Sequence, residues 1–216
     1  MKKLFILSVI ALMSLVGYSQ QDAKAKEILE KVTKKTQSLP SIEAKFSFEM
    51  NNKTENIKEK SSGSIVLKNK KYKLNIPKMG LEVVSDGKTI WTYMLNANEV
   101  SISDADENTD DLMAPERIFT IYERGFNYKL AGESVDAGVP VYNIDLTPQK
   151  PVGDIRTIKL MVDKQKMLIH GANMTGKDGN QYNVIINEYK TDGVYKDTDF
   201  VFDTTKHKDV EVVDMR

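Results

Sequence analysis

The spacing of apolar residues changes near Pro40, and this change divides the chain into two kinds of element. Before it, apolar side chains recur every three or four positions, lysines cover the remaining faces, and Asp22 stands where a helix N-cap is favoured. The pattern predicts an amphipathic helix through about Gln37, packed on a sheet, with a membrane-surface helix as the alternative. The apolar positions are Ala25, Ile28, Leu29 and Val32, followed by Thr36.

After Pro40 the period becomes two, which is typical of half-buried strands. Ala44, Phe46, Phe48 and Met50 alternate with polar residues, and 51–60 is expected to be a polar hairpin loop. Short polar turns separate the later runs, so sequential strands should be antiparallel neighbours. We therefore expect a mostly β (α+β) fold with a curved, partly closed antiparallel sheet. The predicted strands after the first are 63–67, 71–76, 81–85, 88–95, 99–103, 126–131, 139–147, 156–162, 167–175, 181–189 and 200–203.

One segment interrupts this series of strands. Residues 104–111 are acidic, and Pro115 suits the first turn of a helix that would run to Arg124 before Gly125. This helix is expected either to act as a lid over the open end of the sheet or to be a plain crossover. The candidate inner surface of the lid is formed by Leu112, Met113, Ile118, Phe119 and Tyr122.

The N-terminus has the pattern of a secretory signal peptide. Met1-Lys2-Lys3 is basic, Leu4 to Val16 is almost entirely apolar, and small or polar residues follow. We expect cleavage near Ser19–Gln21, so that residues 1–20 are removed and residues 21–216 form a single domain. The chain is therefore predicted to be exported, and no later apolar run is long enough to suggest a second membrane segment.

The inventory of reactive side chains argues against catalysis. The chain has no cysteine and two histidines, His170 in an apolar strand and His207 in a charged run. Asp104, Asp106, Asn108 and Asp110 fall at alternate positions, as in a calcium loop. Thr109 and Pro115, however, stand where that loop needs glycine and a bidentate glutamate. We predict no enzyme activity, no catalytic residue, no metal and no cofactor. Without Lys2 and Lys3 the net charge is about −2, which disfavours nucleic acid.

The apolar inventory is the remaining candidate for function. The chain has ten Met, nine Tyr and seven Phe, and several lie at alternating strand positions. An ordinary core explains them, but a concave sheet face lined by these groups would also bind acyl chains. The candidate cavity residues are Phe46, Phe48, Met50, Tyr72, Leu74, Val83, Trp91 and Tyr93.

Several motifs resemble one known family. S-x-x-A-x-F at 41–46, S-S-G-S-I at 61–65 and V-S-D-G-K-T-I-W-T-Y at 84–93 occur in order, and V-E-V-V-D-x-R at 210–216 ends the series. Together with the signal peptide and first helix, they are similar to the LolA family of periplasmic outer-membrane lipoprotein carriers. The resemblance implies an incomplete, strongly curved antiparallel β-barrel, closed by short helices around an apolar cavity.

The resemblance also implies a function without covalent chemistry. A monomeric periplasmic carrier of this kind takes acylated cargo from an inner-membrane ABC-type lipoprotein release complex to an outer-membrane acceptor. The chain departs from the family at Lys68-Asn69-Lys70, where other members carry K-R-P and the arginine holds the lid closed. Lys68 or Asn69 is the candidate replacement. The cargo is thus a lipoprotein or another lipid, and the alternative is a periplasmic lipid-sensing or protein-binding module.

Overall fold

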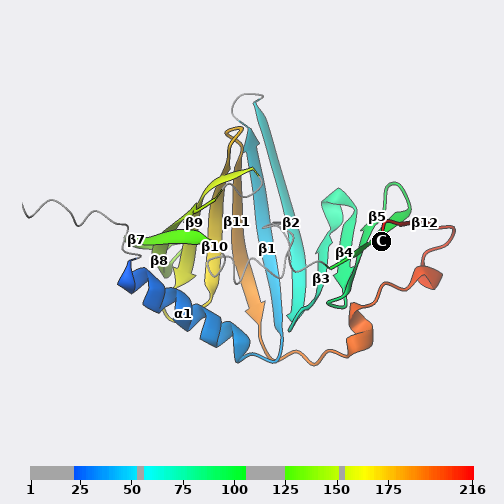
Figure 1. Ribbon diagram of the computed structural model, residues 1–216, viewed down its shortest axis with the longest axis horizontal. Coiled ribbons are helices and arrows are strands. Elements are labelled where there is room, and N and C mark those ends of the chain that lie inside the picture. The colour runs from blue at the N-terminus through cyan, green and yellow to red at the C-terminus, as the bar shows by residue number, and fades with distance from the viewer. Residues whose placement is uncertain (1–21, 53–55, 106–124, 151–153) are drawn as a thin grey trace, which may run out of the picture.

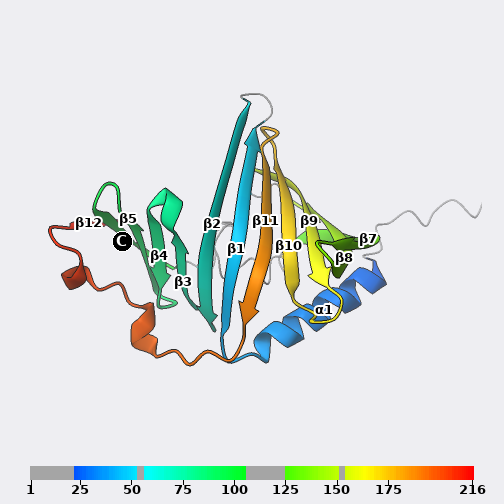
Figure 2. The same ribbon diagram turned by 180° about the vertical axis from the view of Figure 1, so that it is seen from behind.

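The described part of the chain forms a single curved sheet of twelve strands crossed at one end by a helix (Figures 1 and 2). It is a computed structural model that describes residues 22–52, 56–105, 125–150 and 154–216, so the predicted signal peptide and lid lie outside it. The strand order is β12-β6-β5-β4-β3-β2-β1-β11-β10-β9-β8-β7, and the two end strands leave the sheet unclosed. The expected mostly β, antiparallel, incompletely closed fold is confirmed.

The strands follow the predicted succession closely. They are β1 Ile42–Asn52, β2 Ile57–Lys68, β3 Lys71–Ile76, β4 Leu81–Ser85, β5 Thr89–Met94, β6 Glu99–Asp104, β7 Phe126–Asp136, β8 Val139–Pro148, β9 Ile155–Asp163, β10 Ile169–Gly176, β11 Gln181–Lys190 and β12 Glu211–Asp214. Sequential strands that pair do so antiparallel, and β12 is joined to β6 in parallel. Register shifts leave an extra residue in β7, β9, β10 and β11, and irregularities of this kind increase the local twist and bend the sheet.

Helix α1 (Ala23–Gln37) begins as its sequence predicts. The Asp22 carboxylate accepts hydrogen bonds from the backbone N–H of Lys24 (2.9 Å) and Ala25 (3.1 Å), and its second oxygen accepts from Leu130 N–H of β7 (3.0 Å). The bonds from Ala25 and Leu130 are the main causes that lower the pKa of Asp22 below its ordinary value. One carboxylate therefore caps the helix and ties it to the edge strand β7.

The main core lies between α1 and the sheet face below it. The apolar stripe of α1 is fully buried and packs with alternate residues of the strands. We call the sheet face that carries this core the inner face, and the opposite one the outer face. The core includes Ala25, Ile28, Leu29 and Val32 of α1, with Ile42, Ala44, Phe46, Ile65, Leu67, Phe126, Ile144, Leu146, Ile158, Leu160 and Val162 of the sheet.

The structure corrects two local predictions. Much of the expected loop 51–60 is strand, because β1 and β2 stay paired up to Asn52 opposite Ile57. The expected strand 200–203 is absent. Phe200 ends the 3₁₀ turn η5 (Asp197–Phe200), in which the Asp199 carboxylate accepts from Lys196 N–H (2.7 Å), and residues 201–203 are irregular. The strand that reaches the sheet from this region is β12, which lies within the 210–216 motif.

Candidate functional site

The two faces of the sheet differ sharply in polarity. On the outer face, oppositely charged residues sit beside one another on adjacent strands, as in Lys45–Glu188 (2.9 Å) and Lys73–Glu82 (2.9 Å). On the inner face of β1, β3, β4 and β11 no position carries a charged side chain. Exposed ion pairs of this kind contribute little stability, but they keep the outer face hydrated while the inner face stays apolar.

Six of the eight predicted cavity residues share the inner face. Residues directly opposite each other in an antiparallel pair point to the same side, so the register decides this. Phe46, Phe48 and Met50 of β1 lie opposite Ile186, Val184 and Tyr182 of β11. Strands β3 and β4 continue the same face beyond β2. Tyr72 and Leu74 of β3 lie opposite Leu67 and Ile65 of β2, and Val83 of β4 lies opposite Leu74.

These six residues differ in how accessible they are. Phe46 (9% exposed) and Tyr72 (2% exposed) belong to the packed core. Phe48, Met50, Leu74 and Val83 are half-buried. The accessible apolar surface therefore lies on the middle strands, beside the part of the inner face that packs against α1.

The sequence prediction missed four residues of the same surface. Ile76, Tyr182, Val184 and Ile186 are half-buried and pack against the inner-face core. The sequence contains the pattern that could have identified three of them. Tyr182, Val184 and Ile186 alternate with other residues in β11, as Phe46, Phe48 and Met50 do in β1. The rings of Phe48 and Tyr182 stack across these two strands, with centroids 6.1 Å apart.

Phe46 approaches β2 closely because a glycine faces it. Phe46 is paired with Gly63, and a Cβ at Gly63 would stand 2.6 Å from Phe46 Cζ and 2.6 Å from the carbonyl oxygen of Asn75. No side chain fits there without displacing the ring or the β3 backbone. The glycine of the S-S-G-S-I motif is thus explained by the close approach of an aromatic ring.

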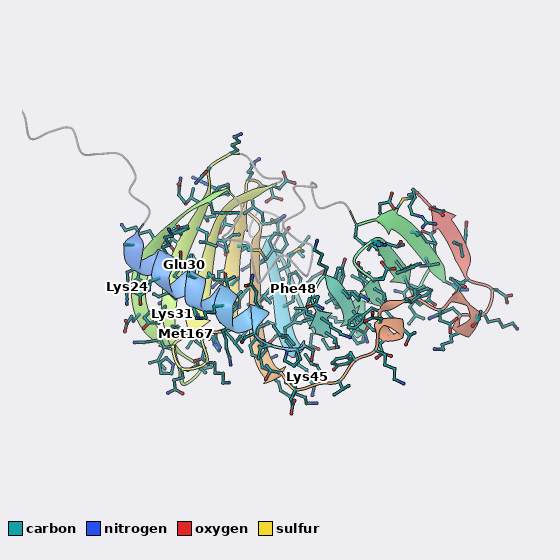
Figure 3. All side chains as sticks on the ribbon, turned by 60° about the horizontal axis from the view of Figure 1, so that its bottom comes forward. Lys24, Glu30, Lys31, Lys45, Phe48 and Met167 are labelled. Carbon is teal, nitrogen blue, oxygen red and sulfur yellow. The ribbon has the colours of Figure 1, made fainter. Side chains whose placement is uncertain are left out.

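Helix α1 borders the inner face. Figure 3 shows Lys24, Glu30 and Lys31 along the helix and Met167 beside it, while Phe48 lies on the middle strands. Between α1 and the start of β7 there is a groove of about 620 Å³. Its apolar lining includes Leu29, Phe126 and Tyr128, and Lys26 and Lys34 stand among its polar residues.

Trp91 and Tyr93 lie on the outer face, away from the other six residues. Trp91 is paired with Val84 and Tyr93 with Glu82, which are outer-face positions. Tyr93 packs against Phe202 (5.3 Å between ring centroids) and His207 (4.5 Å) of the C-terminal segment. The aromatic strand of the family motif therefore anchors the C-terminal segment to the sheet instead of lining the inner face.

Lys68 and Asn69 are also placed by the structure. The Lys68 ammonium donates to the Tyr195 carbonyl (2.8 Å) and to Asp197 (3.1 Å), which also accepts from Lys71 (2.9 Å). Lys68 thus holds the C-terminal segment on the outer face. Asn69 is exposed and occupies the turn with a positive φ of 56°.

The described residues show little arrangement for covalent chemistry. In residues 22–52, 56–105, 125–150 and 154–216 no three His, Cys, Asp or Glu side chains are placed to hold a metal. His170 Nε2 contacts Asp136 (2.8 Å), and that pair joins β10 to the end of β7. Burial raises the pKa of the Tyr189 hydroxyl, which donates to the Ile169 carbonyl (2.6 Å). None of the helices described has the length and apolarity to cross a membrane.

Solved structures share this fold at low sequence identity. An uncharacterized conserved protein from Thermus thermophilus is 16% identical with a TM-score of 0.61, covering 88% of this chain and 99% of its own. MucB in its complex with MucA from Pseudomonas aeruginosa is 19% identical with a TM-score of 0.51, covering 84% of this chain and 62% of that one.

Sequence comparison identifies the family directly. No curated protein matches this chain significantly. The family model described as "Outer membrane lipoprotein carrier protein LolA" matches residues 37–203, which span α1's last residue, the sheet up to β11 and the outer-face C-terminal segment. This chain therefore belongs to the LolA family.

Proposed function

We propose that this chain is an exported carrier that holds acyl chains on the inner face of its sheet. After removal of residues 1–20, the domain 21–216 would take a lipoprotein, or another lipid, from an inner-membrane ABC-type release complex to an outer-membrane acceptor. The observation that carries the proposal is the contrast between the inner face of β1, β3, β4 and β11, which carries no charged side chain, and an ion-paired outer face. The family match supports it independently.

The proposed contact surface consists of half-buried apolar side chains. Phe48, Leu74 and Val83 have area left to bury, and Met50 adds a flexible side chain that adapts to chains of different shape. Each methylene group buried contributes about 0.8 kcal/mol. A few buried methylenes therefore give measurable affinity, while the absence of any covalent bond allows the cargo to leave for a second binding site. The residues proposed for the lid would cover this surface.

A second candidate function, protein binding, is suggested by the fold that this chain shares with MucB. MucB, which shares this fold, was solved in a complex with the protein MucA. The same sheet could therefore serve as a protein-binding or lipid-sensing module in the periplasm. The two proposals differ in whether an acyl chain or a polypeptide occupies the inner face.

The test uses neighbouring residues that point to opposite faces. Leu74 and Asn75 are adjacent in β3, and Leu74 lies on the inner face while Asn75 is exposed on the outer face. Leu74→Glu should reduce the affinity for a fluorescent acyl probe by at least about tenfold, because burying a carboxylate beside a hydrocarbon chain is costly. Asn75→Glu adds the same charge and should leave the affinity unchanged. Val83→Glu should behave like Leu74→Glu.

The wild-type protein provides the decisive measurement. Protein purified from the periplasm should contain co-purified lipid that mass spectrometry identifies, and it should bind an acylated peptide. Protein that is lipid-free and binds no acylated peptide or acyl probe would exclude the carrier function. Equal effects of Leu74→Glu and Asn75→Glu would show that the acyl chain lies elsewhere.

A further inference from the structure

One edge of β2 is left open in the middle of the sheet. Strand β2 pairs with β1 from Ile57 to Leu67, but it pairs with β3 only from Ser64 to Lys68. In Figures 1 and 2, β1 and β2 therefore extend well beyond the end of β3. We call residues 57–62 the open edge, because no strand of the described chain joins them on the side away from β1.

The backbone of the open edge presents hydrogen-bond groups to the outside of the sheet. In an antiparallel strand, the N–H and C=O groups of successive residues point to opposite edges. The carbonyl of Lys60 accepts from Lys78 Nζ (2.6 Å), and Lys78 belongs to the 3₁₀ turn η2 (Pro77–Met79) after β3. The backbone groups of Lys60, and of Lys58 two residues away, therefore point away from β1. A flexible lysine side chain thus occupies an acceptor that a backbone N–H of an added strand could use.

The lysines of the open edge do not guard it. Proteins often place lysine on an exposed sheet edge, where its charge prevents pairing with another chain. Here the ammonium groups of Lys58 and Lys60 both contact the Glu49 carboxylate of β1, at 2.9 Å each. These two bonds are the main causes that lower the pKa of Glu49 below its ordinary value. Both lysine side chains therefore lie across the outer face toward β1, away from the edge.

The inner face becomes polar along the open edge. Ser61 of β2 lies opposite Phe48, and Glu59 lies opposite Met50. The hydroxyl oxygen of Ser61 is buried and has no hydrogen-bond partner. Glu59 is exposed, and the lysines on either side of it in the sequence are both paired with Glu49. The apolar surface proposed for acyl chains thus ends beside polar groups and an open strand edge.

This arrangement suits an acylated polypeptide better than a phospholipid. An extended polypeptide offers N–H and C=O groups at the spacing of a neighbouring strand, and adding a strand to an open edge is a recurring mode of peptide recognition. A phospholipid head group has no such series, and its phosphate would lie near the like-charged Glu59 carboxylate. Acyl chains on Phe48 and Leu74 would leave an attached polypeptide beside Ser61, where the open edge begins.

We propose that the polypeptide part of an acylated cargo pairs as an added strand with the open edge of β2 while its acyl chains lie on the inner face. This proposal rests on the proposed carrier function. The added strand would continue the position of β3 in the sheet, and one of its N–H groups would replace Lys78 at the Lys60 carbonyl. Each backbone hydrogen bond contributes little net affinity, so the pairing orients the cargo and still allows its release.

Backbone methylation of the cargo tests the pairing on the wild-type protein. The probes are palmitoylated peptides of about eight neutral residues, unmodified or N-methylated at either the odd or the even positions. In a paired strand only one of these two sets of N–H groups faces β2. We expect one methylated peptide to bind at least about fivefold more weakly than the unmodified peptide and the other to bind within about twofold of it. Equal affinities of the two methylated peptides would overturn the proposal.

A proline on the open edge tests the same pairing from the side of the protein. Lys60→Pro removes an edge N–H but leaves the ladder with β1, and proline is tolerated on sheet edges. Lys60→Ala is the matched control, because it loses the same ion pair and keeps the N–H. Lys60→Pro should bind the unmodified palmitoylated peptide at least about threefold more weakly than Lys60→Ala does. Equal affinities of the two folded variants contradict the pairing, and if Lys60→Pro does not fold, the methylated peptides decide.

A fluorescent acyl probe without a polypeptide separates this proposal from the carrier function. The wild type and both Lys60 variants should bind this probe equally, because it occupies only the inner face. Wild-type protein that binds the probe but does not distinguish the methylated peptides refutes the open-edge pairing alone. Wild-type protein that binds neither the probe nor any palmitoylated peptide refutes the carrier function. An unacylated peptide that binds as tightly as the palmitoylated one also overturns the proposal, because the open edge would then serve a protein partner instead of acylated cargo.

Discussion

Gly63→Ala is the sharpest test of how the inner face is packed. The new methyl group would stand 2.6 Å from Phe46 Cζ and 2.6 Å from the Asn75 carbonyl oxygen. Both distances are shorter than the contacts that a Cβ atom makes with atoms to which it is not bonded. The Phe46 ring can rotate away, but the Asn75 carbonyl belongs to the β2–β3 pairing, where Asn75 lies opposite Ser64. The substitution must therefore displace both the ring and part of the strand pairing.

The magnitude follows from two opposing effects. Overpacking of this kind costs about 1–3 kcal/mol. Replacing glycine in a strand returns about 0.5–1 kcal/mol, because alanine loses less conformational entropy on folding. We expect a net loss of about 1–2 kcal/mol in the free energy of unfolding. In a chain of this size each kcal/mol of lost stability lowers the midpoint of thermal unfolding by about 2–4 °C.

Urea unfolding of four variants measures the effect and its cause. Phe46→Leu removes ring atoms that meet the new methyl group, so the double variant Gly63→Ala/Phe46→Leu should be more stable than the sum of the single effects predicts. Ser62→Ala, on an exposed neighbouring position, should stay within about 0.5 kcal/mol of wild type. Gly63→Ala as stable as Ser62→Ala, or strictly additive with Phe46→Leu, would refute the packing described here.

Two further predictions concern the outer face and the helix cap. Tyr93→Ala should cost about 3 kcal/mol and expose the segment after Phe202 to proteolysis, but leave acyl binding of the folded protein unchanged; weakened acyl binding would contradict its outer-face position. Asp22→Asn keeps a capping oxygen that does not titrate. Because the folded state lowers the pKa of Asp22, its carboxylate stabilises the fold above the ordinary pKa, and that stability is lost as the pH falls. Chemical unfolding between about pH 4 and pH 2 should therefore show a smaller loss for Asp22→Asn than for wild type, and equal slopes would count against the bond to Leu130.

Much of the fold could be predicted from local patterns. The helix, its N-cap at Asp22 and its end at Gln37 were predicted correctly, because capping and a 3.6-residue period are properties of neighbouring residues. Most strands were also predicted, since alternation and turn residues are local. One of the expected short turns, Asp86-Gly87 between β4 and β5, has a positive φ of 88° at Gly87. The strand β12 was missed because its pairing with the distant strand β6 decides it. The β1–β2 ladder was predicted too short because its outer part has no apolar alternation and is accompanied by ion pairs of Glu49 with Lys58 and Lys60.

The site shows the same division. Alternation in β5 determined that Trp91 and Tyr93 share a face, and alternation in β1 determined that Phe46, Phe48 and Met50 share one. Alternation could not determine that Trp91 and Tyr93 lie on the opposite face from Phe46, because that depends on the register of every strand between β1 and β5. Only the paired sheet shows that Val83 continues the inner face while Val84 and Trp91 lie outside, covered by the C-terminal segment. The sequence alone thus determined most of the elements and the family, and the tertiary structure decided which apolar residues lie together on the inner face.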